Sequence, residues 1–249
     1  MTEKLYLLLS EDGELSYCTY NQDNHKIDHI KTGVYENNIL TDLINRHDQC
    51  ILTYASACFT LVPSQLFDQY FAYDYLKLSR SVSPDTTVMF KKIIPYGIHI
   101  VYAFPSDLSD IIKQKKDKLR VMHHADALME VFRLYTGQGG EAVLVNSEAN
   151  KMDIVVFNGK RPLLCERFNY SSPTEFIYFI LNTFTQLKLS VSETPLFLSG
   201  KIETGSEEYI MAARHFSKIA FAENKHHLVM PHDVKFHRHF NLLSALLCE

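Results

Sequence analysis

Apolar residues in the first half of the chain fall into short runs separated by turn signals, a pattern that predicts strands joined by tight turns. Leu5–Leu9 is a continuous apolar run, typical of a buried strand. Asp12-Gly13 follows it and predicts a hairpin, because glycine reaches the positive φ of a type I′ turn without strain. Further strands are expected at 15–20, 27–32, 50–54, 88–94 and 98–104, and helices at 38–47, from Pro63, from Pro105 and at 124–135.

The same order of patterns returns after a glycine-rich break at 136–140, which we interpret as a linker or turn. Strands are expected at 142–145, 153–157, 163–168, 196–200 and 219–221, with a hairpin at Asn158-Gly159. Ser172-Pro173-Thr174-Glu175 combines a capping box with proline at the first helical position, so a helix begins there. Thr204 and Glu207 form a second capping box.

Both halves therefore have three meandering strands, a helix, a strand, a helix and a final strand, which indicates an internal duplication. Such a unit resembles the ribonuclease-H-like unit, and its duplication resembles the actin-like ATPase superfamily. The second half, from Val143 through Asn158-Gly159 and Arg167 to Pro173, is similar to the actin-like proteins of type IV pilus assembly. The segments 54–67 and 240–249 resemble an uncharacterised bacterial family with this fold.

The resemblance implies an α/β fold of duplicated ribonuclease-H-like domains, with actin-like ATPase architecture. The first domain would span 1–136 and carry an extra hairpin, and the second would span 141–249. In this superfamily nucleotide lies between the domains, and each domain's first hairpin holds phosphate and metal with Asp-x-Gly-x-Thr/Ser. A turn after the fourth strand of the second domain, usually with paired glycines, holds adenosine.

This chain departs from that pattern at all three places, so the nucleotide motifs are degenerate. The first turn contains Ser10, Asp12 and Gly13, with no aspartate where the strand ends. The second is the expected turn 146–150, whose candidate residues are Asn146, Ser147 and Glu148 and which has neither aspartate nor glycine. The adenosine turn retains one glycine, Gly200. Losing the carboxylate removes the metal anchor, and a Cβ in place of glycine crowds the phosphate.

Charge and composition narrow the classes of function further. The 249 residues carry a formal net charge of −4 without a basic block, which argues against nucleic acid as partner. No apolar run approaches the ~20 residues of a membrane span, so membrane insertion is not expected, and the apolar run at 5–9 does not form a signal peptide. Five cysteines without paired spacing suggest reduced thiols and a cytoplasmic location.

Histidines gather near the carboxyl end and are the candidates for a metal site. Zn²⁺ requires three or four converging ligands, and no metal-binding motif accompanies these residues. We therefore interpret the segment as an irregular stretch around Pro231 and predict no metal. The five histidines are His226, His227, His232, His237 and His239.

The sequence favours a non-catalytic cytoplasmic protein that binds an unknown protein partner and acts in assembly or regulation. No cofactor is predicted. The alternative is an ATPase or phosphotransferase with atypical phosphate loops, which would use ATP and Mg²⁺. A metal-dependent hydrolase built on the histidines is a third hypothesis.

Overall fold

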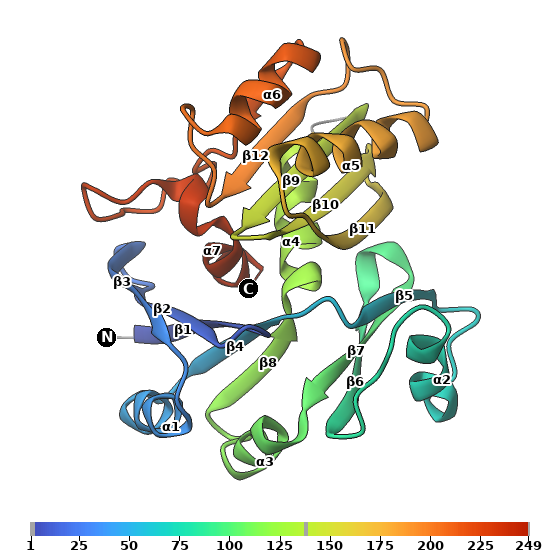
Figure 1. The fold of residues 1–249 in the computed structure, drawn as a ribbon. Helices are drawn as coiled ribbons and strands as arrows, with labels where there is room; N and C mark the ends of the chain where they lie inside the picture. Colours follow the sequence, from blue (N-terminus) through green and yellow to red (C-terminus); the bar gives the residue numbers. More distant parts are fainter. Residues whose placement is uncertain (1–2, 137–138, 249) are drawn as a thin grey trace. The chain divides into compact units, whose positions relative to one another are not determined.

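The computed structural model describes residues 3–136 and 139–248, which divide into two compact units, Met1–Asp126 and Ala127–Glu249 (Figure 1). Gly137 and Gln138 of the glycine-rich break lie outside the described residues. The remaining residues of the break, 136, 139 and 140, belong to the second unit. The boundary between the two units therefore lies before the break, within helix α4 (His124–Phe132).

The first unit contains a five-stranded sheet in the order β3-β2-β1-β4-β8. β1–β3 form an antiparallel meander, whereas β1, β4 and β8 run parallel to one another. Gly13, at φ +81°, occupies the predicted hairpin turn between β1 and β2. The sheet's strands are β1 (Glu3–Ser10), β2 (Glu14–Asn21), β3 (Lys26–Val34), β4 (Cys50–Ala55) and β8 (Leu119–His123).

Helices α1 (Asn37–Arg46) and α3 (Ser106–Gln114) confirm two of the expected helices. α1 buries Leu40 and Ile44, which stand four residues apart on one face. Its N-cap is Glu36, so Asn38 lies inside the helix instead of preceding it.

An insertion between β4 and α3 forms a separate three-stranded sheet in the order β5-β7-β6. The expected hairpin around Pro95-Tyr96-Gly97 is confirmed, but the helix expected from Pro63 is wrong. Pro63 ends edge strand β5, where its missing N–H costs no ladder hydrogen bond, and the helical residues begin later. The insertion consists of β5 (Phe59–Pro63), η1 (Gln69–Phe71), α2 (Ala72–Lys77), β6 (Thr86–Ile93), η2 (Ile94–Tyr96) and β7 (Ile98–Pro105).

The second unit contains a five-stranded sheet in the order β11-β10-β9-β12-β13, again with an antiparallel meander followed by parallel strands. Gly159, at φ +56°, occupies the Asn158-Gly159 hairpin as predicted. The strands are β9 (Glu141–Glu148), β10 (Lys151–Asn158), β11 (Arg161–Asn169), β12 (Leu196–Gly200) and β13 (Ile219–Phe221).

Alternating residues of this sheet enter two apolar layers. One face packs against α5 (Pro173–Gln186) and α6 (Glu207–His215), and the core there includes Ile154 and Phe176. The other face meets α4, η3 (Arg133–Tyr135) and α7 (Phe240–Leu247), through ring contacts such as that of Phe132 with Phe157. The predicted cap Ser172 is confirmed, but α6 is capped by Ser206 and not by Thr204.

The two sheets share one strand order and one pattern of parallel and antiparallel pairs. Both begin with a three-strand meander, cross over through a helix to the fourth strand, and add the fifth strand beyond it. This agreement confirms the duplication predicted from the order of patterns in the sequence.

Candidate functional site

The expected adenosine turn begins at Gly200, the last residue of β12, whose backbone lies directly against β9. Gly200 has a φ of +82°, and a Cβ placed on it would lie 2.0 Å from the carbonyl oxygen of Ser147. The same oxygen accepts a hydrogen bond from the N–H of Lys201. Only glycine fits here, and the reason is internal packing between two strands of the second unit.

Ser147 is buried, and its hydroxyl takes part in an internal chain of hydrogen bonds. The Tyr170 hydroxyl donates to the Ala149 carbonyl at 2.8 Å. The Ser147 Oγ, 2.8 Å from the Tyr170 oxygen, therefore donates to it. Burial raises the pKa of Tyr170, so the phenol keeps its proton for this bond. Ala149 adopts a φ of +55° in the two-residue turn, a position that usually favours glycine.

A row of polar side chains crosses four strands beside Ser147. Asp153 of β10 stands directly opposite Arg167 of β11 and Asn146 of β9, and Asn146 stands opposite Ser199 of β12. Arg167 holds Asp153 with two bonds of 2.7 Å, through Nε and Nη2. Asn146 donates to Asp153 at 3.3 Å and accepts from the Ser199 hydroxyl at 3.0 Å.

Every member of this row is buried, and the charged pair is almost completely shielded from water. A buried carboxylate is stable only when it is paired and hydrogen-bonded, and the two-pronged guanidinium contact supplies both conditions. The row thus acts as a satisfied structural network across the face of the sheet that carries Phe157. Asp153 carried no signal in the sequence beyond its place in a strand, although the pairing of β10 with β11 sets it directly opposite Arg167.

The structure corrects the secondary structure of Asn146, Ser147 and Glu148, which were expected in a turn. All three belong to β9, and only Ala149 and Asn150 form the turn. Asn146 and Ser147 are nearly inaccessible to solvent, at 0% and 2% exposure, while Glu148 is half-buried at the strand end. Continuous pairing with β10 as far as Glu148–Lys151 extends the strand past the polar residues.

In the first unit, the corresponding turn is also stabilised from within. The Ser10 hydroxyl accepts a hydrogen bond from the Glu14 N–H at 3.0 Å, across the turn that Gly13 closes. The Glu11 carboxylate accepts from the Ala57 N–H at 3.0 Å, joining the turn to the end of β4. Asp12 is exposed at the tip.

Ser56 and His123 form a buried pair at the carboxyl ends of β4 and β8, which sequence reasoning missed. The Ser56 Oγ lies 3.4 Å from the His123 Nε2, and the His123 Nδ1 accepts the Ala125 N–H at 3.3 Å. An accepting Nδ1 assigns the ring proton to Nε2, so the histidine donates to the serine. A general base needs the opposite tautomer, and we therefore interpret this pair as structural.

The candidate metal-site histidines do not converge in the part of the chain that the structure describes. No group of three or more His, Cys, Asp or Glu side chains suited to a metal ion occurs among residues 3–136 and 139–248. His237 instead stacks on Phe221, with ring centroids 4.3 Å apart. Burial lowers the pKa of His226, His237 and His239.

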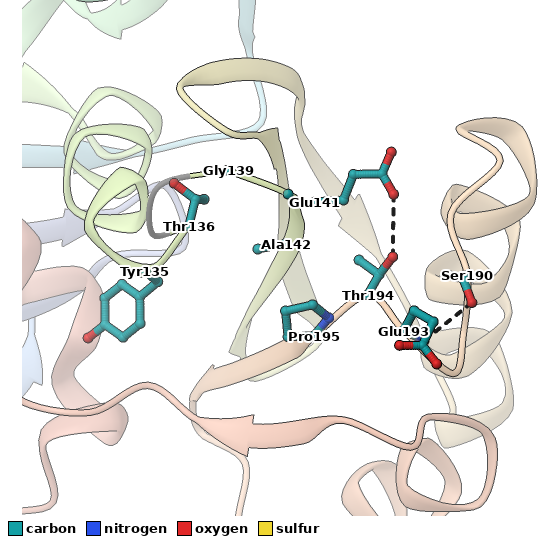
Figure 2. A pocket seen from close by; sticks show the side chains of 10 residues that line it. Tyr135, Thr136, Gly139, Glu141, Ala142, Ser190, Glu193, Thr194 and Pro195 are labelled. Atoms are coloured by element: carbon teal, nitrogen blue, oxygen red, sulfur yellow. Dashed lines mark hydrogen bonds between the residues drawn. The ribbon is translucent and has the colours of Figure 1, made fainter.

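A small cavity of about 330 Å³ opens at the amino ends of β9 and β12 (Figure 2). Glu141, Thr194 and Tyr135 contribute to its wall. The Thr194 hydroxyl donates weakly to the Glu141 carboxylate at 3.5 Å. Because Glu141 and Glu148 are opposite ends of β9, this cavity is remote from Ser147 and Gly200, and none of the predicted site residues lines it.

Solved structures with the same fold define the class. The chain matches a Bacteroides thetaiotaomicron protein of actin-like ATPase fold and unknown function, with a TM-score of 0.81, 16% identity, and coverage of 100% of this chain and 96% of that one. It also matches the PilM-PilN type IV pilus biogenesis complex (TM-score 0.63, 11% identity, 99% and 98% covered). The cytoplasmic domain of EpsL, an inner membrane component of the type II secretion system of Vibrio cholerae, matches with a TM-score of 0.54 (11% identity, 99% and 95% covered). The chain thus has an actin-like ATPase fold, as predicted.

The chain belongs to the family described as "Protein of unknown function (DUF3822)", whose model matches residues 2–219. No curated protein is similar enough to count as a match. Within the described residues, no helix is both long and apolar enough to cross a bilayer.

Replacing Gly200 with alanine should lower the free energy of unfolding by about 2–4 kcal/mol, because the new Cβ meets the Ser147 carbonyl at a left-handed backbone position. Urea unfolding followed by circular dichroism measures the change. Gly205→Ala is the matched control, since a Cβ there meets nothing within 4 Å. Equal losses in the two variants would contradict the packing argument.

Arg167→Met should lower the free energy of unfolding by about 3–5 kcal/mol, because it leaves the Asp153 carboxylate buried without its main partner. The double variant Arg167→Met/Asp153→Leu should recover much of this loss, since neither charge then remains. Lys218→Met, which removes an exposed ion pair with Glu193, should cost less than about 1 kcal/mol. Equal losses in the free energy of unfolding for Arg167→Met and Lys218→Met, measured by urea unfolding, would contradict this account.

Acidification from pH 7.5 to 5.5 should destabilise the second unit. Burial holds the pKa of His226, His237 and His239 below the ordinary value of 6.5, so below that pH the unfolded state binds more protons than the folded state. Stability is therefore fully present above about pH 6.5 and falls as the pH approaches the folded-state values. In thermal unfolding, His237→Gln/His239→Gln should flatten this pH dependence, and an equally steep pH dependence in this variant would contradict the assignment to the buried histidines.

Proposed function

We propose that this chain is a non-catalytic cytoplasmic protein that uses an actin-like fold to bind a protein partner in an assembly or regulatory complex. One observation carries the proposal: the groups expected to hold nucleotide are used inside the fold. Ser10 and Ser147 are engaged in internal hydrogen bonds, and Gly200 is closed against the backbone of Ser147.

The chemical requirements of phosphate transfer support a non-catalytic role. A metal–phosphate grip uses an acidic anchor, free backbone N–H groups and an available hydroxyl at each turn. Neither first hairpin has the Asp-x-Gly pattern that the resemblance implies, and both serine hydroxyls have internal partners. We accordingly propose that the protein has no ATP or Mg²⁺ cofactor.

The structural neighbours support a protein partner. One is solved as the PilM-PilN complex, and another is part of an inner membrane component of a secretion system. Both are therefore proteins of larger assemblies, and a similar scaffold in this chain is consistent with binding to a partner.

The insertion of the first unit exposes apolar side chains over a short stretch around η1 and α2. Tyr70 and Leu78 are 83% and 85% exposed. Single exposed apolar residues are ordinary on protein surfaces, but a cluster of them is typical of an interaction surface. The exposed large apolar residues between positions 66 and 78 are Leu66, Tyr70, Phe71, Tyr73 and Leu78.

Affinity capture of the tagged full chain from its native cell should recover one companion protein in about equimolar amount. Tyr70→Ser/Leu78→Ser should reduce its recovery at least about tenfold, since interface anchors of this type carry much of the binding energy. Tyr178→Ser, at an exposed position on α5, is the control and should retain the companion. No companion, or equal recovery with all three proteins, contradicts the proposal. Turnover of Mg-ATP by the wild type would favour the alternative, an ATPase or phosphotransferase with atypical loops.

A further inference from the structure

The carboxyl-terminal segment folds back onto the loop that follows β12. The 3₁₀ turn η4 (Phe236–His239) lies against β12, and two basic residues of the segment meet one carboxylate of the loop. Lys235 Nζ lies 2.6 Å from Glu203 Oε2, and Arg238 Nη1 lies 3.5 Å from Glu203 Oε1. Glu203 thus clamps residues on both sides of His237.

His237 completes a stack of three rings from three different elements. Tyr209 of α6 lies parallel to Phe221 of β13, with centroids 5.4 Å apart, and the imidazole of His237 stacks on Phe221 as well, at 4.3 Å. Ile202, a residue of the loop, is 1% exposed. The imidazole therefore occupies one face of an aromatic platform beside the loop.

The position that His237 covers lies at the end of the sheet where α/β proteins usually bind ligands. Ligands of such sheets bind outside the carboxyl ends of the parallel strands, and β9, β12 and β13 all run parallel, with the loop at the carboxyl end of β12. An aromatic face there suits a flat heteroaromatic ring, because such rings stack on one another. In this chain the flat ring is supplied by His237.

We propose that residues 235–239 form an autoinhibitory cap, in which His237 fills the ring-stacking position beside the β12–α6 loop and the Glu203 clamp keeps it there. The clamp is weak enough to open, since the side chains of Lys235, Arg238 and Glu203 are 60%, 56% and 37% exposed. The cap is also tethered by residues 222–235, a connection without helix or strand. The inference rests on the proposed function, because a self-filled position is one reason for the chain to bind no nucleotide.

Hydrogen–deuterium exchange of the full chain tests the clamp. In Lys235→Ala/Arg238→Ala, amides of residues 201–206 and 219–223 should exchange about two- to fivefold faster, the range expected for exposed ion pairs. Lys218→Ala, which breaks an exposed pair with Glu193 in the same unit, should leave those amides unchanged. Unchanged exchange in the clamp variant overturns the cap.

Calorimetric titration with adenosine tests what the cap covers. The wild type should give no saturable heat, and Lys235→Ala/Arg238→Ala/His237→Ala should bind adenosine saturably at millimolar concentration. No binding by this triple variant overturns the inference while leaving the proposed function intact. Binding of adenosine by the wild type as tightly as by the variant also overturns the cap. Failure of the proposed function has a different signature, turnover of Mg-ATP by the wild type.

Discussion

The contact between Gly200 and the carbonyl of Ser147 determines what the second unit presents at the ends of its parallel strands. At this point β12 approaches β9 so closely that no Cβ fits, and the Ser147 oxygen accepts the next backbone N–H. With the Ser147 hydroxyl bonded to Tyr170, both the carbonyl and the hydroxyl of this residue are used within the fold. The glycine at this turn therefore serves packing between β12 and β9, and we propose that the actin-like scaffold works here without a phosphate grip.

The two units share one strand order but differ in the side chains that their strands carry. Asn146, the third residue from the end of β9, is paired with Asp153 and Ser199. Leu8, the third residue from the end of β1, is paired with Ser16 and Thr53. The charged pair occurs only in the second row. A slip of β11 by one residue would turn Arg167 to the opposite face and leave Asp153 buried alone, so the pair specifies register more than it adds stability.

Much of the fold was predictable because short-range signals determine it. The meanders of both sheets were predicted from the glycine turns at 13 and 159 and from the alternation of apolar and polar residues. The start of α5 was predicted from Ser172-Pro173. Strand β8 was missed, since Leu119–His123 is only five residues long, lacks a regular alternation of polar and apolar residues, and directly follows a lysine-rich stretch. Pro63 was misread because a proline that opens a helix and one that ends an edge strand look alike without knowledge of pairing.

The candidate site was predictable only in part, since its residues act across strands that lie far apart in the sequence. Ser147 and Gly200 were identified as candidates, but their mutual contact depends on strand pairing. The most direct test of the account is a ³¹P NMR titration of Mg-ATP with the full-length wild-type chain. The account predicts that the three phosphate resonances keep their shifts and widths at equimolar protein. Saturable shifts or broadening of the β and γ signals would contradict it.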